Sequence, residues 1–401
     1  MSDFFQPVKV TDTVYWVGAI DWDVRDFHGY ATSRGTTYNA YLVLGEKVTL
    51  VDTVKEQFVP EMMTRISRVI NPEKICCIVS NHAEIDHSGG LPQVAAQIKP
   101  ERILASKMGV KVLNEHFNNA DLHLTPVSQG DVLNLGNRTL HFMETRMLHW
   151  PDSMFTYMPE ERLLFSQDAF GMHLASAERF ADQVTPSLIY REMAKYFANI
   201  LLPYSNLVLK LIDRLVEMDL KIDIIAHDHG PIIRRDVENA IGWYKRWANQ
   251  APTNRGIIIY DTMWGSTMKM AKVIADGIHK GGGKAELMPM GGSHRSDVAT
   301  EMLHAGALIA GSPTLNNNMF PTMADVLCYL KGLRPRNLVG AAFGSYGWGG
   351  EGVKQVRELL EQMDVEVLGE RRAKYVPTDD DLDSCFQLGV EIGTRLAENT
   401  R

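Results

Sequence analysis

The chain has 401 residues, of which 45% are hydrophobic, and its 41 Lys+Arg against 49 Asp+Glu give a formal net charge of −8. At roughly 150 residues per domain, this length predicts two or three folding units, and the ordinary composition excludes a disordered, collagen-like or coiled-coil chain. A general nucleic-acid binder is disfavoured as well, because such affinity depends on clustered Lys and Arg.

The first half of the chain, up to about residue 250, mixes short apolar runs with helical patterns. Strands are predicted at residues 14–17, 39–43, 47–51 and 75–80. Helices are predicted at residues 60–69, at 91–98 and over a longer region from about 192 to 217. This mixture favours stacked α/β layers over an all-β sandwich.

Directly after the strand predicted at 75–80, four possible metal ligands fall within six residues: His82, Glu84, Asp86 and His87. In an extended or looped segment, the two-residue period places the first three of them on one side of the chain. A polar loop with a helix-capping aspartate would explain Asp86 alone. It would not explain a histidine and a glutamate at matched spacing.

Three more candidates, His149, Asp168 and His229, stand at the ends of later apolar runs. Each of them alone would more often be structural. Together with the first four they predict a metal site assembled at strand ends.

The spacing His-x-[His/Glu]-x-Asp-His, followed by distant His, Asp and His, resembles the metallo-β-lactamase superfamily, an αββα sandwich with a two-metal site. Residues 37–43 and 50–53 look like early strands of that family. The resemblance implies one metal held by His82, Glu84 and His149, a second held by Asp86 and His229, and Asp168 bridging them. His87 could be a ligand of the second metal or could turn away. His227 is a weaker alternative, because the family's histidine directly precedes Gly-Pro.

Glu84 departs from the hydrolytic members of the superfamily, which generally have histidine at this position. Three carboxylates with at least three imidazoles form a hard, anionic ligand set that suits iron or manganese better than zinc. Glu84 therefore shifts the prediction from hydrolysis to redox chemistry.

Beyond a boundary near residues 250–255, strands and helices alternate regularly, which predicts two domains, 1–250 and 251–401. Strands are expected at residues 256–260, 285–290, 307–310, 337–343 and 365–368, and helices among them at 266–280 and 379–396. Five strands alternating with five helices are typical of a doubly wound parallel sheet.

Three loops at the carboxyl ends of these strands are candidates for a flavin site, since ligands bind there in such sheets. The first opens a helix with hydroxyls around a glycine and comprises Thr262, Met263, Trp264, Gly265, Ser266 and Thr267. It lacks the signatures of triphosphate and dinucleotide loops, so a single terminal phosphate, as in FMN, fits it best. The other two loops contribute Pro313, Thr314, Leu315, Asn316 and Asn317, and Ser345, Tyr346, Gly347, Trp348 and Gly349. Trp264, Tyr346 and Trp348 are the candidates to flank the isoalloxazine ring.

Residues 256–401 resemble flavodoxin, and the two halves together resemble the flavodiiron proteins. The expected fold is thus α/β, an N-terminal αββα metallo-β-lactamase-like sandwich followed by a C-terminal flavodoxin-like doubly wound parallel sheet. The resemblance implies reduction of O₂ to water or of NO to N₂O at a non-haem diiron centre with an oxo or hydroxo bridge. Electrons would arrive through FMN. It also implies a head-to-tail homodimer, or a dimer of such dimers.

The four cysteines, Cys76, Cys77, Cys328 and Cys385, form no C-x-x-C pair and so encode no rubredoxin-type module. We therefore expect a separate electron donor such as rubredoxin. Few cysteines, no secretory signal pattern and no bilayer-length apolar stretch predict a cytoplasmic protein without a membrane part.

Two other functions fit parts of the sequence. One is a binuclear zinc hydrolase with a flavodoxin-like regulatory domain, and the other is an electron carrier with a vestigial metal site. The ligand set does not choose between O₂ and NO. His28, Trp150 and Tyr196 are expected near the metals as packing residues more than as proton donors.

Overall fold

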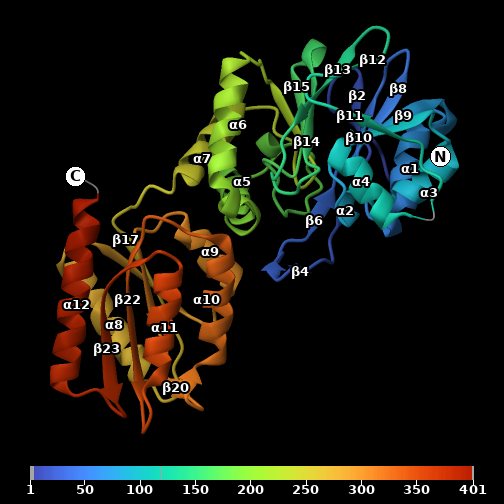
Figure 1. Cartoon of the computed structure of the whole chain (residues 1–401). Helices are drawn as coiled ribbons and strands as arrows, with labels where there is room; N and C mark the ends of the chain where they lie inside the picture. The colour runs from blue at the N-terminus through green and yellow to red at the C-terminus, as the bar shows by residue number, and fades with distance from the viewer. Residues whose placement is uncertain (1–3, 119, 400–401) are drawn as a thin grey trace. The chain divides into compact units, whose positions relative to one another are not determined.

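A computed structural model describes residues 4–118 and 120–399. The chain forms two compact units (Figure 1). The first comprises residues up to His28, Thr32–Tyr196 and Asn206–Lys245, and the second comprises Gly29–Ala31, Phe197–Ser205 and the chain from Arg246 onward. None of the helices in the described ranges combines the length and the apolar character needed to cross a membrane.

Two sheets form the centre of the first unit. The seven-stranded sheet has the order β1 (Val8–Lys9), β2 (Val14–Trp16), β7 (Tyr41–Val43), β8 (Val48–Val51), β9 (Ile75–Ser80), β10 (Arg102–Ser106) and β11 (Leu124–Val127). The five-stranded sheet has the order β12 (Val132–Asn134), β13 (Thr139–Glu144), β14 (Met154–Met158), β15 (Leu163–Gln167) and β16 (Ile224–His227). Shorter strands are β3 (Ala19–Asp21), β4 (Asp26–Phe27), β5 (Tyr30–Ala31) and β6 (Thr36–Tyr38).

Helices cover the outer faces of both sheets (Figure 1). The helices α1 (Val59–Val69), α3 (Leu91–Ile98) and α4 (Lys107–His116) lie on the seven-stranded sheet. The helices α5 (Pro186–Tyr196), α6 (Ser205–Glu217) and α7 (Val237–Asn249) lie on the side of the five-stranded sheet. Strand β9 shows why this layering forms. Ile78 packs in the apolar cluster with the helices, whereas Cys77 and Val79 pack between the sheets against Phe142 and Phe165. The αββα sandwich is confirmed.

The second unit contains a five-stranded sheet whose neighbouring strands are all parallel. Its order is β18 (Lys284–Pro289), β17 (Arg255–Tyr260), β19 (Ala307–Gly311), β22 (Val339–Tyr346) and β23 (Glu366–Lys374). Its helices are α8 (Ser266–Lys280), α9 (Arg295–Met302), α10 (Pro321–Leu333), α11 (Glu351–Gln362) and α12 (Asp379–Glu398), and a hairpin joins β20 (Thr314–Leu315) to β21 (Asn318–Met319). The doubly wound parallel sheet is confirmed.

Several predicted boundaries differ from the structure. The helical region expected at about 192–217 is helical but interrupted: it comprises the end of α5, a π-helical turn at Phe197–Leu201, a 3-10 turn at Leu202–Tyr204 and then α6. Pro203 explains the interruption, because proline lacks the N–H for the helical bond and its ring clashes with the preceding turn. The strand expected at 39–43 begins only at Tyr41, as β7. Residue Asn39 lies outside it, and its buried amide donates to the carbonyls of His227 and Gly230. Strands β22 and β23 extend beyond their predicted ends, since their pairing continues to Tyr346 and Lys374.

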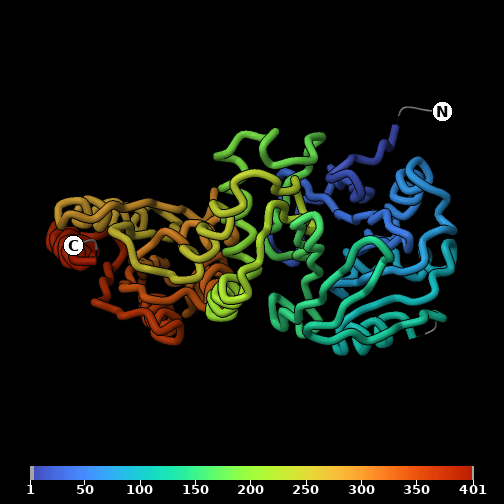
Figure 2. The backbone as a smooth tube through the Cα atoms, turned by 90° about the horizontal axis from the view of Figure 1, so that it is seen from above, coloured from blue at the N-terminus to red at the C-terminus, as the bar shows by residue number. Residues whose placement is uncertain are grey.

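Short turns complete the description. Helix α2 (Ile85–Ser88) follows β9, and 3-10 turns lie at Glu56–Phe58, Pro72–Lys74, Pro159–Glu161 and Ala181–Gln183. Within the second unit, α8 and α12 lie side by side in both views (Figures 1 and 2).

A candidate metal centre and a candidate flavin cleft

The candidate metal ligands come from chain segments that follow strands of the first unit. His82 and Glu84 lie between β9 and α2, and His149 lies in the loop between β13 and β14. Asp168 and His229 follow β15 and β16, which are parallel neighbours, so their carboxyl ends meet at one edge of the sheet.

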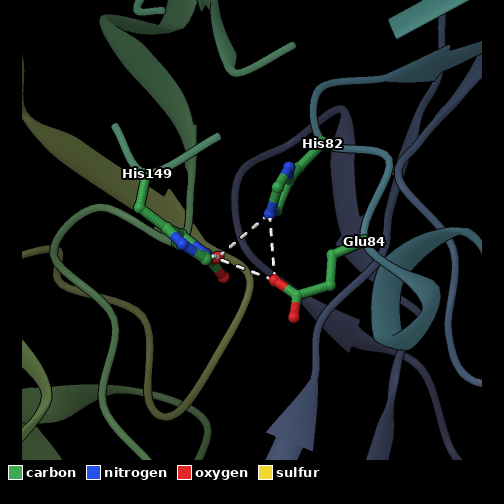
Figure 3. Close-up of side chains that lie close together, drawn as sticks. His82, Glu84 and His149 are labelled. Atoms are coloured by element: carbon green, nitrogen blue, oxygen red, sulfur yellow. Dashed lines mark hydrogen bonds and ion pairs between the residues drawn. The ribbon is translucent and has the colours of Figure 1, made fainter. Parts of the chain in front are cut away.

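The first group of ligands consists of His82, Glu84, His149 and Asp168, whose ligand atoms all lie within 4.8 Å of one another. Nε2 of His149 is 2.9 Å from Oδ2 of Asp168 and 3.2 Å from Oε2 of Glu84. Nε2 of His82 is 3.3 Å from the same Glu84 oxygen. Figure 3 shows the side chains of His82, Glu84 and His149 pointing toward one common space.

The second group consists of Asp86, His87 and His229. Oδ2 of Asp86 is 3.1 Å from Nε2 of His229 and 3.3 Å from Nε2 of His87. Oδ1 of Asp168 is 3.1 Å from His87 Nε2 and 3.3 Å from His229 Nε2. One oxygen of Asp168 therefore faces each group, which is the geometry of a bridging carboxylate.

Buried partners orient the imidazole rings. Nδ1 of His82 is 3.1 Å from Oδ2 of Asp152, which also accepts a hydrogen bond from the Ala83 N–H at 2.6 Å. Nδ1 of His229 donates to the carbonyl of Thr37 at 2.7 Å. These contacts use the Nδ1 positions and leave Nε2 as the atom that can bind a metal.

The charges of the cluster call for cations. Among the described residues, both oxygens of Asp86 and Oδ1 of Asp168 are buried without a hydrogen-bond partner. Burial alone would lower the pKa of His229, but Asp168 and Asp86 outweigh it and raise the pKa to about 10. Burial of His87 is likewise outweighed by Asp86 and Asp168, and its pKa rises to about 9. Because buried carboxylates are costly without positive partners, two metal ions fit this donor set.

In the second unit, a cavity of about 560 Å³ opens at the carboxyl ends of β17, β19 and β22. All of the residues predicted for the flavin site line this cavity except Thr262, Gly265 and Thr267. Trp264 and Trp348 are 95% and 90% exposed, so their aromatic faces are free to cover a flat ligand. The apolar walls fit an isoalloxazine ring.

The three remaining residues shape the loop at the start of α8. Gly265 caps the helix with φ +89°, a left-handed conformation that disfavours side chains, and its N–H donates to Oγ1 of Thr262 at 3.0 Å. Thr267 is buried, with Oγ1 3.0 Å from Oγ of Ser345. The free N–H groups of the first helical turn suit the phosphate of FMN.

Comparisons with known proteins agree with both sites. A family model described as ODP family beta lactamase matches residues 36–230, and a flavodoxin model matches residues 258–389. The chain is 45% identical to a nitric oxide reductase of Moorella thermoacetica over 98% of this chain and 100% of that protein. It superposes with a TM-score of 0.96 on a rubredoxin oxygen:oxidoreductase from Desulfovibrio gigas, at 43% identity over 98% of this chain and 100% of the other. A flavodiiron protein from Giardia intestinalis matches at 33% identity with a TM-score of 0.95, over 100% and 98% of the two chains.

The chain belongs to the flavodiiron proteins. Family membership assigns FMN to the flavodoxin unit and a diiron centre to the buried His, Asp and Glu cluster.

Three further residues that the sequence suggested for this region of the flavodiiron protein lie beside the candidate ligands. His28 places Nε2 3.1 Å from Oε1 of Glu84, the Trp150 ring is 5.2 Å from that of His82, and the Tyr196 ring is 5.9 Å from that of His229. His227 belongs to neither ligand group, and burial together with His229 lowers its pKa to about 3.

Sequence reasoning missed four residues of these sites: Asp152, Thr37, Tyr375 and Val376. The first two act through single contacts from distant loops and follow no spacing pattern. Tyr375 and Val376 could have been found, because they directly follow the fifth parallel strand and so belong at the same edge as the other flavin loops.

Proposed function

We propose that this flavodiiron protein reduces O₂ to water or NO to N₂O, with electrons passing through FMN from a separate rubredoxin-like donor. Support comes from the relatives, which are named for nitric oxide reduction and for transfer between rubredoxin and oxygen. The reactions are O₂ + 4 e⁻ + 4 H⁺ → 2 H₂O and 2 NO + 2 e⁻ + 2 H⁺ → N₂O + H₂O. When bound, the iron ions and FMN supply this redox chemistry.

The observation that carries the proposal is the shared carboxylate. Asp168 directs Oδ2 toward His149 and Oδ1 toward His87, so two metal positions are held as a pair. A pair of adjacent metals can act on both atoms of O₂, or on two NO molecules, at the same time. The burial of the proposed ligands other than His149, which is half-buried, limits the access of bulk water to the reacting centre.

We propose the ligands as follows: His82, Glu84 and His149 for one iron, Asp86, His87 and His229 for the other, and Asp168 between them. The loops at 262–267, 313–317 and 345–349 are the proposed FMN contacts. Residues 1–250 and 251–401 are the proposed diiron and FMN domains.

The assembly and location are also proposals. A head-to-tail homodimer, or a dimer of such dimers, would bring the FMN of one subunit to the irons of its partner, and sedimentation of the holoprotein tests this. A cytoplasmic location is supported by the four cysteines, which are all free thiols.

The decisive experiment compares fully reduced protein mixed with O₂ and with NO in a stopped-flow instrument, following the flavin absorbance. The flavin is expected to be reoxidised by at least one of the gases, and the gas that reoxidises it faster is the preferred substrate. Repeated turnover is then measured with an excess of a reduced rubredoxin-like donor. Metal analysis of protein from minimal medium accompanies it. Two zinc ions and no iron per chain would refute the redox proposal and favour a hydrolase.

A further inference from the structure

His87 presents its two ring nitrogens to different partners. Nε2 lies 3.1 Å from Oδ1 of Asp168 and 3.3 Å from Oδ2 of Asp86, within the second ligand group. Nδ1 lies 3.4 Å from Oδ2 of Asp228. The ring, which is 1% exposed, thus stands between the metal position and a carboxylate behind it.

Asp228 is well placed to fix this ring. It is 1% exposed and stands between the end of β16 and the ligand His229. Its N–H donates to the carbonyl of Gln167 at 2.9 Å, and its own carbonyl accepts from the N–H of Asn39 at 2.7 Å. Within residues 4–118 and 120–399, Oδ2 of Asp228 has no hydrogen-bond partner, and the ion-pair contact with His87 is the interaction that the structure gives it.

The first ligand group contains a similar arrangement, in which the contact is shorter and is a hydrogen bond. Nδ1 of His82 lies 3.1 Å from Oδ2 of Asp152, while its Nε2 faces Glu84. Each metal position therefore has one imidazole with a buried carboxylate behind it. Such a carboxylate selects the tautomer with hydrogen on Nδ1, aims Nε2 at the metal and makes it more basic, and its loss typically lowers metal affinity about 10–100-fold.

We propose that Asp228 is a positioning residue that accepts a hydrogen bond from Nδ1–H of His87, holds Nε2 toward the second metal and so makes His87 a ligand. Without this carboxylate, nothing in the described contacts of Nδ1 would keep the ring from turning away. The inference rests on the proposed function only in requiring that the second group binds a metal.

The test titrates metal-free protein with Co²⁺, following the visible absorption of cobalt and the heat of binding. Asp228→Ala should weaken one of the two cobalt ions about 10–100-fold and change its spectrum, leaving the other ion unchanged. Asp228→Asn should recover most of the affinity, because its amide oxygen still accepts from Nδ1–H. Asp152→Ala is the matched control and should weaken the other ion.

A double variant separates positioning from general damage. In the His87→Ala background, Asp228→Ala should cause no further loss, because its effect passes through the ring. If Asp228→Ala fails to fold, Asp228→Leu, which keeps the volume without an acceptor, replaces it. Wild-type cobalt affinity in Asp228→Ala or Asp228→Leu, or a further loss in the His87→Ala background, would overturn the proposal. Because cobalt binding is read without turnover, wild-type protein that consumes neither gas would refute the proposed function alone.

Discussion

Replacing Gly389 by alanine should disrupt the packing of α12 against α8. A Cβ on Gly389 would lie 2.3 Å from the carbonyl oxygen of Ile274, and one on Gly277, in the facing helix, 2.2 Å from that of Phe386. Ordinary contact begins at 3.4 Å, so the helices would have to separate by about 3.4 − 2.3 = 1.1 Å. The obstructing atoms belong to the backbone of a packed helix and cannot rotate away.

The magnitude follows from what this face buries. Leu388, Ile392 and Leu396 of α12 are fully buried in the core of the second unit. A gap of this size forfeits a quarter to a half of the dispersion energy across it, and overpacking costs about 1–3 kcal/mol. Alanine gains roughly 0.5–1 kcal/mol over glycine in a helix. The net loss in the free energy of unfolding should be about 1–2 kcal/mol.

Urea unfolding of the holoprotein, followed by the fluorescence of released FMN at fixed total FMN, measures this loss in the flavodoxin unit. Gly332→Ala in α10 is the matched control, since a Cβ there would meet no atom within 4 Å. It should stabilise the unit by roughly 0.5–1 kcal/mol. If Gly389→Ala proved as stable as Gly332→Ala, the close approach of the two helices would be refuted.

Three further predictions concern the two sites. Asp168→Ala should lower the metal affinity of both positions by at least about 100-fold, because the two carboxylate oxygens of Asp168 face the two ligand groups. Elemental analysis that finds one iron fully retained would contradict this. Thr267→Leu should overpack the buried contact with Ser345, so the FMN content should fall severalfold while the iron content is unchanged. Loss of both cofactors would argue against independent sites. In metal-free protein, burial lowers but the carboxylates raise the pKa values of His87 and His229, to about 9 and about 10, so both rings must release protons when a metal binds. Cobalt affinity should therefore rise from pH 6 to pH 8, by up to about tenfold per unit for each proton released, whereas a flat profile would refute this charge state.

The convergence of the candidate ligands was predictable because strands can be recognised as apolar runs, and the carboxyl ends of neighbouring parallel strands meet. His82, Asp168 and His229 each lie within two residues of the end of a strand, which is β9, β15 and β16 respectively. The residues behind the ligands were not predictable in this way. Asp152 reaches His82 from a loop 70 residues away in the chain, and only the folded sandwich brings the two together.

The ends and interruptions of helices and strands were only partly predictable from the sequence. Pro203 lies within the region predicted to be helical. The rule that proline disrupts a helix interior would have placed the interruption between α5 and α6. The later start of β7, at Tyr41 instead of Asn39, could not be predicted, since the two carbonyl partners of the Asn39 amide, at His227 and Gly230, lie far along the chain. The glycines of α8 and α12 repeat at helical spacing, but only the structure shows that they face each other.

The charges of the metal centre explain why Glu84 matters to the chemistry. Glu84, Asp86 and Asp168 contribute −3. Without metals, the neighbouring carboxylates outweigh burial and raise the pKa values of four rings, those of His82, His87, His149 and His229. Two divalent metals with neutral imidazoles give +4 − 3 = +1. A histidine in place of Glu84 would leave +2, and each electron removed from the metals would add a further positive charge in a space with little water. The third carboxylate lowers that cost, because opposite charges attract strongly where water does not screen them. A site with this ligand set can therefore lose electrons more readily than its hydrolytic counterpart.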